Sequence, residues 1–159
     1  MKLEINSPAP EFEGIIQTGK KISLSKYKGK WVILYFYPKD NTPGCTIEAC
    51  NFRDDKERFA EVDAVIIGVS GDSIKAHSNF IMKHDLNFDL ISDTEKTIIE
   101  QYGVWKEKSM CGKTFMGIER TTFIINPEGN IAEIFSKVKP AGHTDAVYAR
   151  LLELQGKEA

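Results

Sequence analysis

WVILYFYPKDNTPGCTIEACNFRDDKERFAEVDAVIIGV, residues 31–69, contains two apolar runs on either side of a segment of helical length. Residues 31–37 are β-branched, aromatic or leucine, and they end at Pro38. Such a run predicts a strand buried on both faces, and residues 64–69 show the same pattern. Residues 44–62 between them have the length and composition of a helix. The segment is therefore predicted to be a βαβ unit with a parallel pair of strands.

Apolar spacing outside this unit predicts further helices and strands. The expected helices are residues 73–85, 92–102 and 144–155, and the expected strands are residues 88–91, 121–126 and 131–136. The second helix opens on Ser92-Asp93-Thr94-Glu95, which has the spacing of a capping box. The last two strands flank Asn126-Pro127-Glu128-Gly129-Asn130, which is typical of an antiparallel hairpin. Together they predict an α/β fold, a central mixed β-sheet flanked by helices on both faces, in one domain over residues 1–159.

Residues 103–119 form the longest segment without clear periodicity. Long loops in compact domains are often functional, so this one is a candidate part of a site. The alternative is a loop whose apolar residues cap the core. Both interpretations remain open from the sequence.

The composition is that of one ordinary domain. The chain has 159 residues, 42% of them hydrophobic, with 21 basic and 23 acidic side chains and a formal charge of -2. This balance does not favour nucleic acid or anionic lipid as a partner, and it suits a small neutral substrate. No apolar run approaches the roughly 20 residues of a membrane-spanning helix. Residues 1–8 include an acidic residue and a proline where a secretory signal would be apolar, so we expect a cytoplasmic protein.

Cys45 lies at a predicted helix start. Thr42 suits the N-cap and Pro43 the first helical position, which makes Cys45 the third helical residue. Free backbone N–H groups and the positive end of the helix dipole stabilise a thiolate there. Ala49 and Phe52 lie on the same helix face as Cys45, and this face is directed at the sheet. Cys45 itself lies beyond the carboxyl end of the first predicted strand, where α/β folds bind ligands. The alternative is a cysteine that serves as a small apolar core residue.

Cys50 follows Cys45 by five residues. In a regular helix this spacing places the two Cα atoms roughly 8 to 9 Å apart, beyond the roughly 7 Å limit for a disulfide. If the two cysteines pair during turnover, the first turns of the helix must unwind. We therefore expect a local rearrangement on oxidation.

Other uses of the cysteines fit the sequence less well. C-x-x-C spacing is absent, and the C-x4-C opening of an iron–sulfur site would need a cysteine where Arg53 stands, so no metal or cofactor is expected. A cysteine hydrolase would need a histidine base. His77, His84 and His143 are all remote in sequence, and we expect each at the surface or at a helix end.

The run Pro38-Lys39-Asp40-Asn41-Thr42-Pro43-Gly44-Cys45-Thr46-Ile47-Glu48-Ala49-Cys50 closely resembles the active-site signature of the peroxiredoxin family, in its bacterioferritin comigratory protein (PrxQ) branch. The resemblance extends from residues 9–12 through residues 117–125 to the C-terminal helix. It implies a thioredoxin-like fold. It also implies a monomer.

The resemblance implies a role for each site residue. Cys45 would be the peroxidatic cysteine, Thr42 its hydrogen-bonding partner, and Pro38 a shield over the pocket. Arg120, which is distant in sequence, would lie at the site in the folded protein. A guanidinium there can stabilise the thiolate and the charge that develops on the peroxide. Glu48 lies three residues after Cys45, and its charge would disfavour the thiolate unless neutralised. We expect Glu48 to pair with Arg120 or Arg53.

The implied reaction is peroxide reduction by sulfur chemistry. The Cys45 thiolate attacks the O–O bond of hydrogen peroxide or an organic hydroperoxide, releases water or an alcohol, and becomes a sulfenic acid. Cys50 resolves it as a disulfide, and thioredoxin or a similar dithiol protein reduces the disulfide.

Two alternatives accompany this interpretation. Cys111 departs from the pattern of the branch, and we expect it to be inert rather than a second resolving thiol. A thioredoxin-fold binding or holdase protein with vestigial cysteines is the competing function, because fold alone does not fix function.

Overall fold

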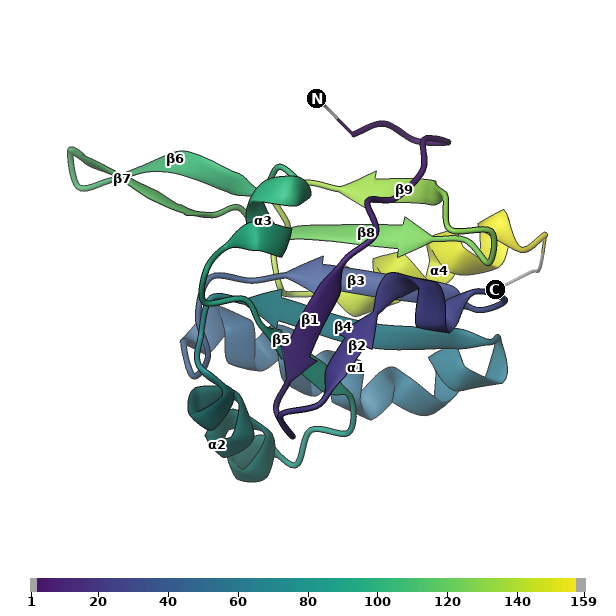
Figure 1. Ribbon diagram of the computed structural model, residues 1–159, viewed down its shortest axis with the longest axis horizontal. Coiled ribbons are helices and arrows are strands. Elements are labelled where there is room, and N and C mark those ends of the chain that lie inside the picture. Colours follow the sequence, from purple (N-terminus) through teal and green to yellow (C-terminus); the bar gives the residue numbers. More distant parts are fainter. Residues whose placement is uncertain (1–2, 157–159) are drawn as a thin grey trace.

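The computed structural model describes residues 3–156 (Figure 1). Its strands are β1 (Glu13–Ile16), β2 (Lys21–Ser23), β3 (Trp31–Phe36), β4 (Ala64–Ser70), β5 (Asp89–Ser92), β6 (Trp105–Met110), β7 (Lys113–Ile118), β8 (Thr121–Ile125) and β9 (Ile131–Phe135). Its helices are the 3-10 helix η1 (Leu24–Tyr27), α1 (Pro43–Glu61), α2 (Ile74–His84), α3 (Thr97–Gln101) and α4 (His143–Leu154).

The predicted βαβ unit is present. β3 and β4 pair in parallel, with Trp31 opposite Ala64, and α1 connects them. Side chains of β3 alternate between two core clusters: Ile33 and Tyr35 pack in the cluster that contains α1, and Val32 packs in the other. Both faces of β3 are therefore buried, which confirms the interpretation of its continuous apolar run.

The sheet is mixed, as predicted. Its seven strands run in the order β2-β1-β5-β4-β3-β8-β9, in which β3, β4 and β5 are parallel and the other neighbours are antiparallel. β8 and β9 form the predicted hairpin. The parallel strands are central, so the segments that follow β3, β4 and β5 meet at one end of the sheet.

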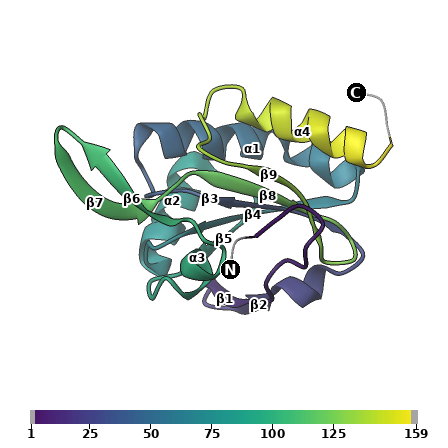
Figure 2. The same ribbon diagram turned by 90° about the horizontal axis from the view of Figure 1, so that it is seen from above.

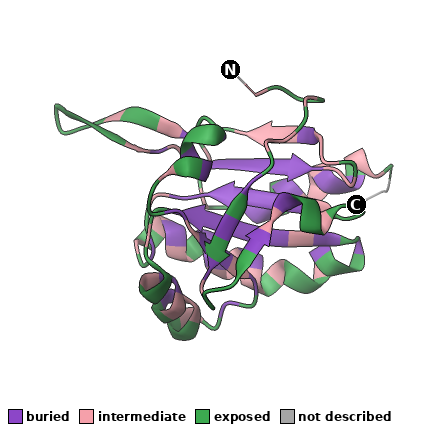
Figure 3. Ribbon diagram, in the orientation of Figure 1, coloured by how far each residue is buried: buried purple, intermediate pink, exposed green. Residues whose placement is uncertain are grey.

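Helices cover both faces of the sheet. α1, α2 and α4 contribute Phe52, Phe80 and Leu151 to one core cluster, whereas η1 and α3 contribute Leu24 and Ile99 to the other. Figure 2 shows α1 and α4 side by side on one face, with α3, β1 and β2 towards the other. Figure 3 shows that the central strands are the most deeply buried part of the protein.

The helix predicted at 92–102 is shorter than expected. α3 starts at Thr97 with Lys96 as its N-cap, and Ser92 is the last residue of β5, so the predicted capping box is wrong. The Asp93 carboxylate instead accepts a hydrogen bond from the N–H of Ile99 at 2.8 Å. β1, β2 and η1 were not predicted.

Residues 103–119 form a hairpin rather than an irregular loop. β6 and β7 pair from Trp105 opposite Ile118 to Met110 opposite Lys113. The connecting residues, Cys111 and Gly112, have φ values of 53° and 77°, as in a two-residue type I′ turn. The hairpin projects beyond the seven-stranded sheet (Figure 1). Its outer apolar side chains do not cap the core, because they are exposed: Met110, Phe115 and Met116.

Among residues 3–156, no helix is both long enough and apolar enough to cross a bilayer.

Candidate active site

Cys45 lies in the first turn of α1. Thr42 is the N-cap, in an extended conformation, and Pro43 begins the helix, so Cys45 is the third helical residue, as predicted. The Cys45 side chain is 1% exposed and packs in the core cluster with Ala49. Amide N–H groups in the first turn have no carbonyl partner within the helix, and the positive end of the dipole lies there. The thiol therefore occupies a position where negative charge is stabilised.

Arg120 brings a guanidinium to this thiol. It precedes β8, and the pairing of Thr121 with Phe36 places it beside the carboxyl end of β3. Its Nη2 donates to Cys45 Sγ at 3.1 Å, and its Nη1 donates to Glu48 Oε1 at 3.1 Å. One planar guanidinium thus bridges the two side chains, a geometry that the single ammonium of lysine does not reproduce.

Gly44 provides the space for this contact. A Cβ atom at Gly44 would lie 2.8 Å from Arg120 Nη2 and 3.4 Å from Pro140 Cγ. This role of Gly44 was not predicted from the sequence. A signal was available, because glycine within the first turn of a helix lowers helix stability and suggests that a side chain is excluded there.

Glu48 pairs with Arg120 rather than with Arg53, which instead donates to Asp54 and to the carbonyl of His84. The Glu48 side chain is 1% exposed, and its Oε2 has no hydrogen-bond partner among the described residues. Burial raises the pKa of Glu48 from 4.5 to about 7, and the nearby Arg120 opposes this rise. Glu48 therefore changes charge near neutral pH.

Thr42 and Pro38 lie in the segment between β3 and α1. The Thr42 hydroxyl donates to the carbonyl of Lys39 at 2.8 Å. Its proton is thus engaged, and its lone pairs remain free to accept a hydrogen bond. Pro38 is half-buried in the same segment.

Cys50 and Cys111 are both free thiols, as is Cys45. Cys50 is partly buried in α1, which is helical without a break from Pro43 to Glu61. The rearrangement expected on oxidation stays a prediction. Cys111 is exposed in the turn of the β6–β7 hairpin, so it is not a buried apolar residue, and its expected inertness stays a prediction.

The histidines only partly follow the prediction. His84 and His143 lie at helix ends, but His77 is fully buried within α2. His143 is also buried, with Nε2 2.8 Å from Thr122 Oγ1, and burial lowers the pKa of His143 from 6.5 to about 4.

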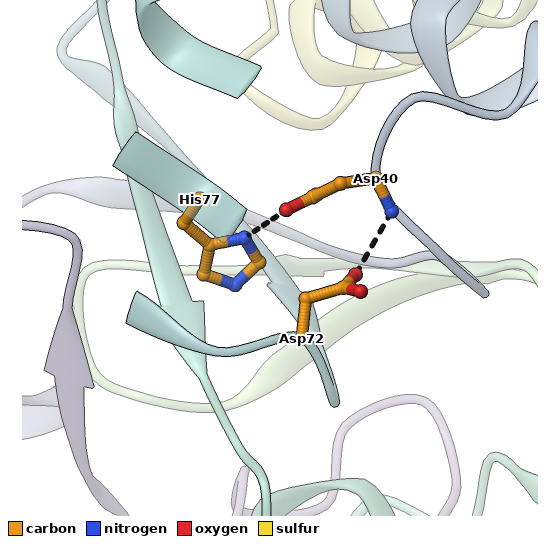
Figure 4. A group of neighbouring side chains, drawn as sticks. All are labelled: Asp40, Asp72 and His77. Atoms are coloured by element: carbon orange, nitrogen blue, oxygen red, sulfur yellow. Dashed lines mark hydrogen bonds and ion pairs between the residues drawn. The ribbon is translucent and has the colours of Figure 1, made fainter. Parts of the chain in front are cut away.

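One group of described side chains has metal-like geometry. Asp40, Asp72 and His77 each offer a ligand atom within 4.8 Å of the others (Figure 4). The facing atoms already make protein hydrogen bonds, including Asp40 Oδ2 with His77 Nδ1 at 2.7 Å. The group is therefore a hydrogen-bond network, and it was not predicted from the sequence.

Comparisons with known proteins show which family the chain belongs to. Residues 5–134 match the AhpC/TSA family. The chain belongs to this family of peroxiredoxins. It is 49% identical to Peroxiredoxin Bcp of Bacillus subtilis over 157 residues, which cover 99% of this chain and 100% of the relative. It is 40% identical to Peroxiredoxin Bcp of Escherichia coli over 151 residues, which cover 95% of this chain and 97% of that one.

Solved structures give the same result. PrxQ of Xylella fastidiosa superimposes with a TM-score of 0.91 at 34% identity, covering 96% of this chain and 98% of that one. The bacterioferritin comigratory protein of Xanthomonas campestris gives 0.85 at 42% identity, covering 89% and 90%. The expected thioredoxin-like fold and PrxQ branch are confirmed. This peroxiredoxin is a thiol-dependent peroxidase, and the alternative of a vestigial binding protein is set aside.

Proposed function

We propose that Cys45 is the peroxidatic cysteine and that Arg120, Thr42, Pro38 and Glu48 form its site. The observation that carries this proposal is the 3.1 Å contact from Arg120 Nη2 to Cys45 Sγ in the first turn of α1. The guanidinium and the helix start both stabilise negative charge at the same sulfur.

The first chemical step forms a sulfenic acid. The thiolate attacks the terminal oxygen of the peroxide, an S–O bond forms as the O–O bond breaks, and two electrons pass from sulfur to the peroxide. The departing oxygen takes up a proton and leaves as water or an alcohol. Arg120 stabilises the charge that develops on this oxygen, and Thr42 accepts a hydrogen bond from the peroxide hydroxyl. Pro38 shields the reacting atoms from water.

Cys50 then resolves the sulfenic acid. Its sulfur attacks Cys45, the sulfenic oxygen leaves as water, and an intramolecular disulfide forms. The continuous helix from Pro43 to Glu61 opposes this step, since a five-residue helical separation is roughly 8 to 9 Å between Cα atoms. The first turns of α1 must therefore unwind during each cycle.

Organic hydroperoxides as well as hydrogen peroxide are the proposed substrates. The Xanthomonas campestris relative is described in terms of alkyl peroxide reduction. In this chain, Lys108 of β6 and Arg120 line the same pocket. Burial lowers the pKa of Lys108, and the nearby charge of Arg120 lowers it further. Phe115 pairs with Lys108 across the hairpin and is 44% exposed. This apolar side chain suits an alkyl group.

The proposal also covers the reductant, the oligomeric state, the compartment and the domain organisation of the protein. Thioredoxin or a similar dithiol protein reduces the disulfide by thiol exchange. The protein acts as a monomer in the cytoplasm, and residues 1–159 form a single domain. The core supports this last point, because both clusters pack against one sheet.

A coupled assay tests the proposal. Thioredoxin, its reductase and NADPH are mixed with the protein and either hydrogen peroxide or an alkyl hydroperoxide, and peroxide-dependent NADPH loss is followed. We expect Cys45→Ser to abolish the reaction and Cys50→Ser to abolish turnover with thioredoxin. Cys111→Ser, the matched control, keeps the full rate. Loss of turnover in Cys111→Ser but not in Cys50→Ser would reverse the assignment of the resolving thiol.

A further inference from the structure

The segment between β3 and α1 carries Pro38 and Thr42, and a buried hydrogen-bond network holds this segment. The central residue of the network is Asp40, which lies five residues before Cys45 and is 6% exposed. A buried carboxylate is costly unless its oxygens are hydrogen-bonded. The hydrogen bonds of Asp40 therefore show how the protein holds this segment in place.

Three contacts fix Asp40. Its Oδ1 accepts from the Tyr37 hydroxyl at 2.6 Å, and its Oδ2 lies 2.7 Å from His77 Nδ1. Its backbone N–H donates to Asp72 Oδ2 at 2.8 Å. The partners come from the end of β3, from α2 and from the segment after β4, and Figure 4 shows Asp72 and His77 converging on Asp40.

The His77 ring is held at both nitrogens. Nε2 lies 2.9 Å from the carbonyl oxygen of Ile91 in β5, which can only accept, so Nε2 donates. Nδ1 faces Asp40 Oδ2, so one proton lies between these two atoms. The Tyr37 hydroxyl keeps its proton, since burial, with contributions from Tyr35 and Asp40, raises the pKa of Tyr37 well above its usual value. The network is thus fully paired, which makes it rigid.

We propose that Asp40 and His77 are positioning residues for the peroxidase reaction, which fix the segment bearing Thr42 and Pro38 relative to Cys45. Neither residue touches the reacting atoms. Through their hydrogen bonds, they anchor the segment that contacts the peroxide to β5 and α2. The inference rests on the proposed role of Cys45 and adds two residues that act through others.

The experiment compares two reactions of the same thiol. Cys50→Ser and Cys111→Ser are combined so that Cys45 is the remaining thiol. The rate of Cys45 sulfenic acid formation with hydrogen peroxide is measured by trapping and mass spectrometry, and so is the rate of alkylation by iodoacetamide. Peroxide reduction needs the geometry of Thr42 and Pro38, whereas alkylation needs only a reactive thiol. The ratio of the two rates therefore reports positioning.

Three substitutions test the network in this background. Asp40→Ala removes both side-chain contacts, and we expect the peroxide rate to fall up to about 100-fold while alkylation changes much less. In Asp40→Asn the amide accepts from Tyr37 and donates to His77 Nδ1, so the ratio recovers. The matched control is Asp93→Ala, which removes a carboxylate of similar burial that holds α3 and leaves the ratio unchanged. If Asp40→Ala does not fold, the isosteric Tyr37→Phe replaces it and lowers the ratio by a smaller factor.

The outcomes separate this inference from the proposed function. If the Cys45-only protein forms no sulfenic acid with peroxide, the proposed role of Cys45 fails. If it does, but Asp40→Ala or Tyr37→Phe lowers both rates equally or neither, the positioning role is overturned. A ratio in Asp93→Ala as low as in Asp40→Ala also overturns it, because the effect would then be general loosening. A ratio in Asp40→Asn as low as in Asp40→Ala overturns the part played by the hydrogen bonds.

Discussion

Replacing Glu48 with glutamine removes a buried carboxylate and keeps an acceptor for Arg120. The wild-type side chain is 1% exposed, and one of its oxygens accepts from Arg120 Nη1 at 3.1 Å. The amide oxygen of glutamine can accept the same hydrogen bond. The substitution therefore changes the charge and the titration of the site with little change in shape.

The magnitude follows from the raised pKa of Glu48. Burial moves it from 4.5 to about 7, so between these pH values the folded protein holds a proton that the unfolded chain has lost. Stability then falls as pH rises through this window, and above it the folded state carries the full penalty of a buried charge. At about 1.4 kcal/mol for each pH unit, the penalty is about 3 kcal/mol. Glutamine does not titrate and escapes it.

Urea unfolding of wild type and Glu48→Gln across this pH range measures the effect. The stability of the variant relative to wild type should rise by about 3 kcal/mol between about pH 4 and about pH 8. Glu57→Gln, an exposed position on the same helix, should show no such trend. A constant difference between Glu48→Gln and wild type would refute the buried-acid account. At high pH, where wild-type Glu48 is charged and positions Arg120, the rate of Glu48→Gln with peroxide should also be lower than that of wild type. Equal rates would exclude this positioning role of Glu48.

Three further substitutions test the site and its surroundings. Arg120→Lys cannot hold Glu48 and Cys45 together, and stopped-flow measurement should show a peroxide rate about 100-fold lower; an unchanged rate would exclude the bridging role. Gly44→Ala pushes Arg120 off the thiol and should lower this rate about 10-fold, with unfolding changed by less than about 1 kcal/mol; a normal rate would show that Arg120 adapts. Burial lowers the pKa of His143 from 6.5 to about 4, so the free energy of unfolding falls by about 3 kcal/mol as pH drops through this window. His143→Gln should abolish this fall, as measured by urea unfolding. A fall that persists in the variant would show that other groups cause it.

The central elements could be predicted because their signals are local and strong. Pro38 follows the apolar run that starts at Trp31, and Thr42 with Pro43 marks the helix start that places Cys45. Both features depend on propensity and periodicity over a few residues. The expected Arg120–Glu48 pair needed the resemblance as well, since nothing local to residue 120 shows that it returns to α1.

The β6–β7 hairpin shows where periodicity gives no signal. Alternation marks a strand only when one face is buried, and the outer part of this hairpin is exposed on both faces. Its turn was equally hidden, because Cys111 adopts a positive φ more often taken by asparagine, aspartate or glycine.

The Asp40–His77 network was invisible for a different reason. The two residues are 37 positions apart, and their contact arises only when the ends of β3, β4 and β5 meet at one end of the sheet. A buried histidine in an amphipathic helix has the same local sequence pattern as one at the surface. The pairing is a tertiary property that composition and spacing do not contain.

In the proposed reaction, Cys45 attacks the peroxide and Cys50 resolves the Cys45 sulfenic acid. Both lie between Lys39 and Arg53, so trypsin releases them in one peptide, residues 40–53. Mass spectrometry after one equivalent of hydrogen peroxide, without reduction, should show this peptide lighter by two hydrogens, with Cys111 still free. A cross-link between Cys45 and Cys111, or a Cys45 that remains an unmodified thiol, would contradict the account.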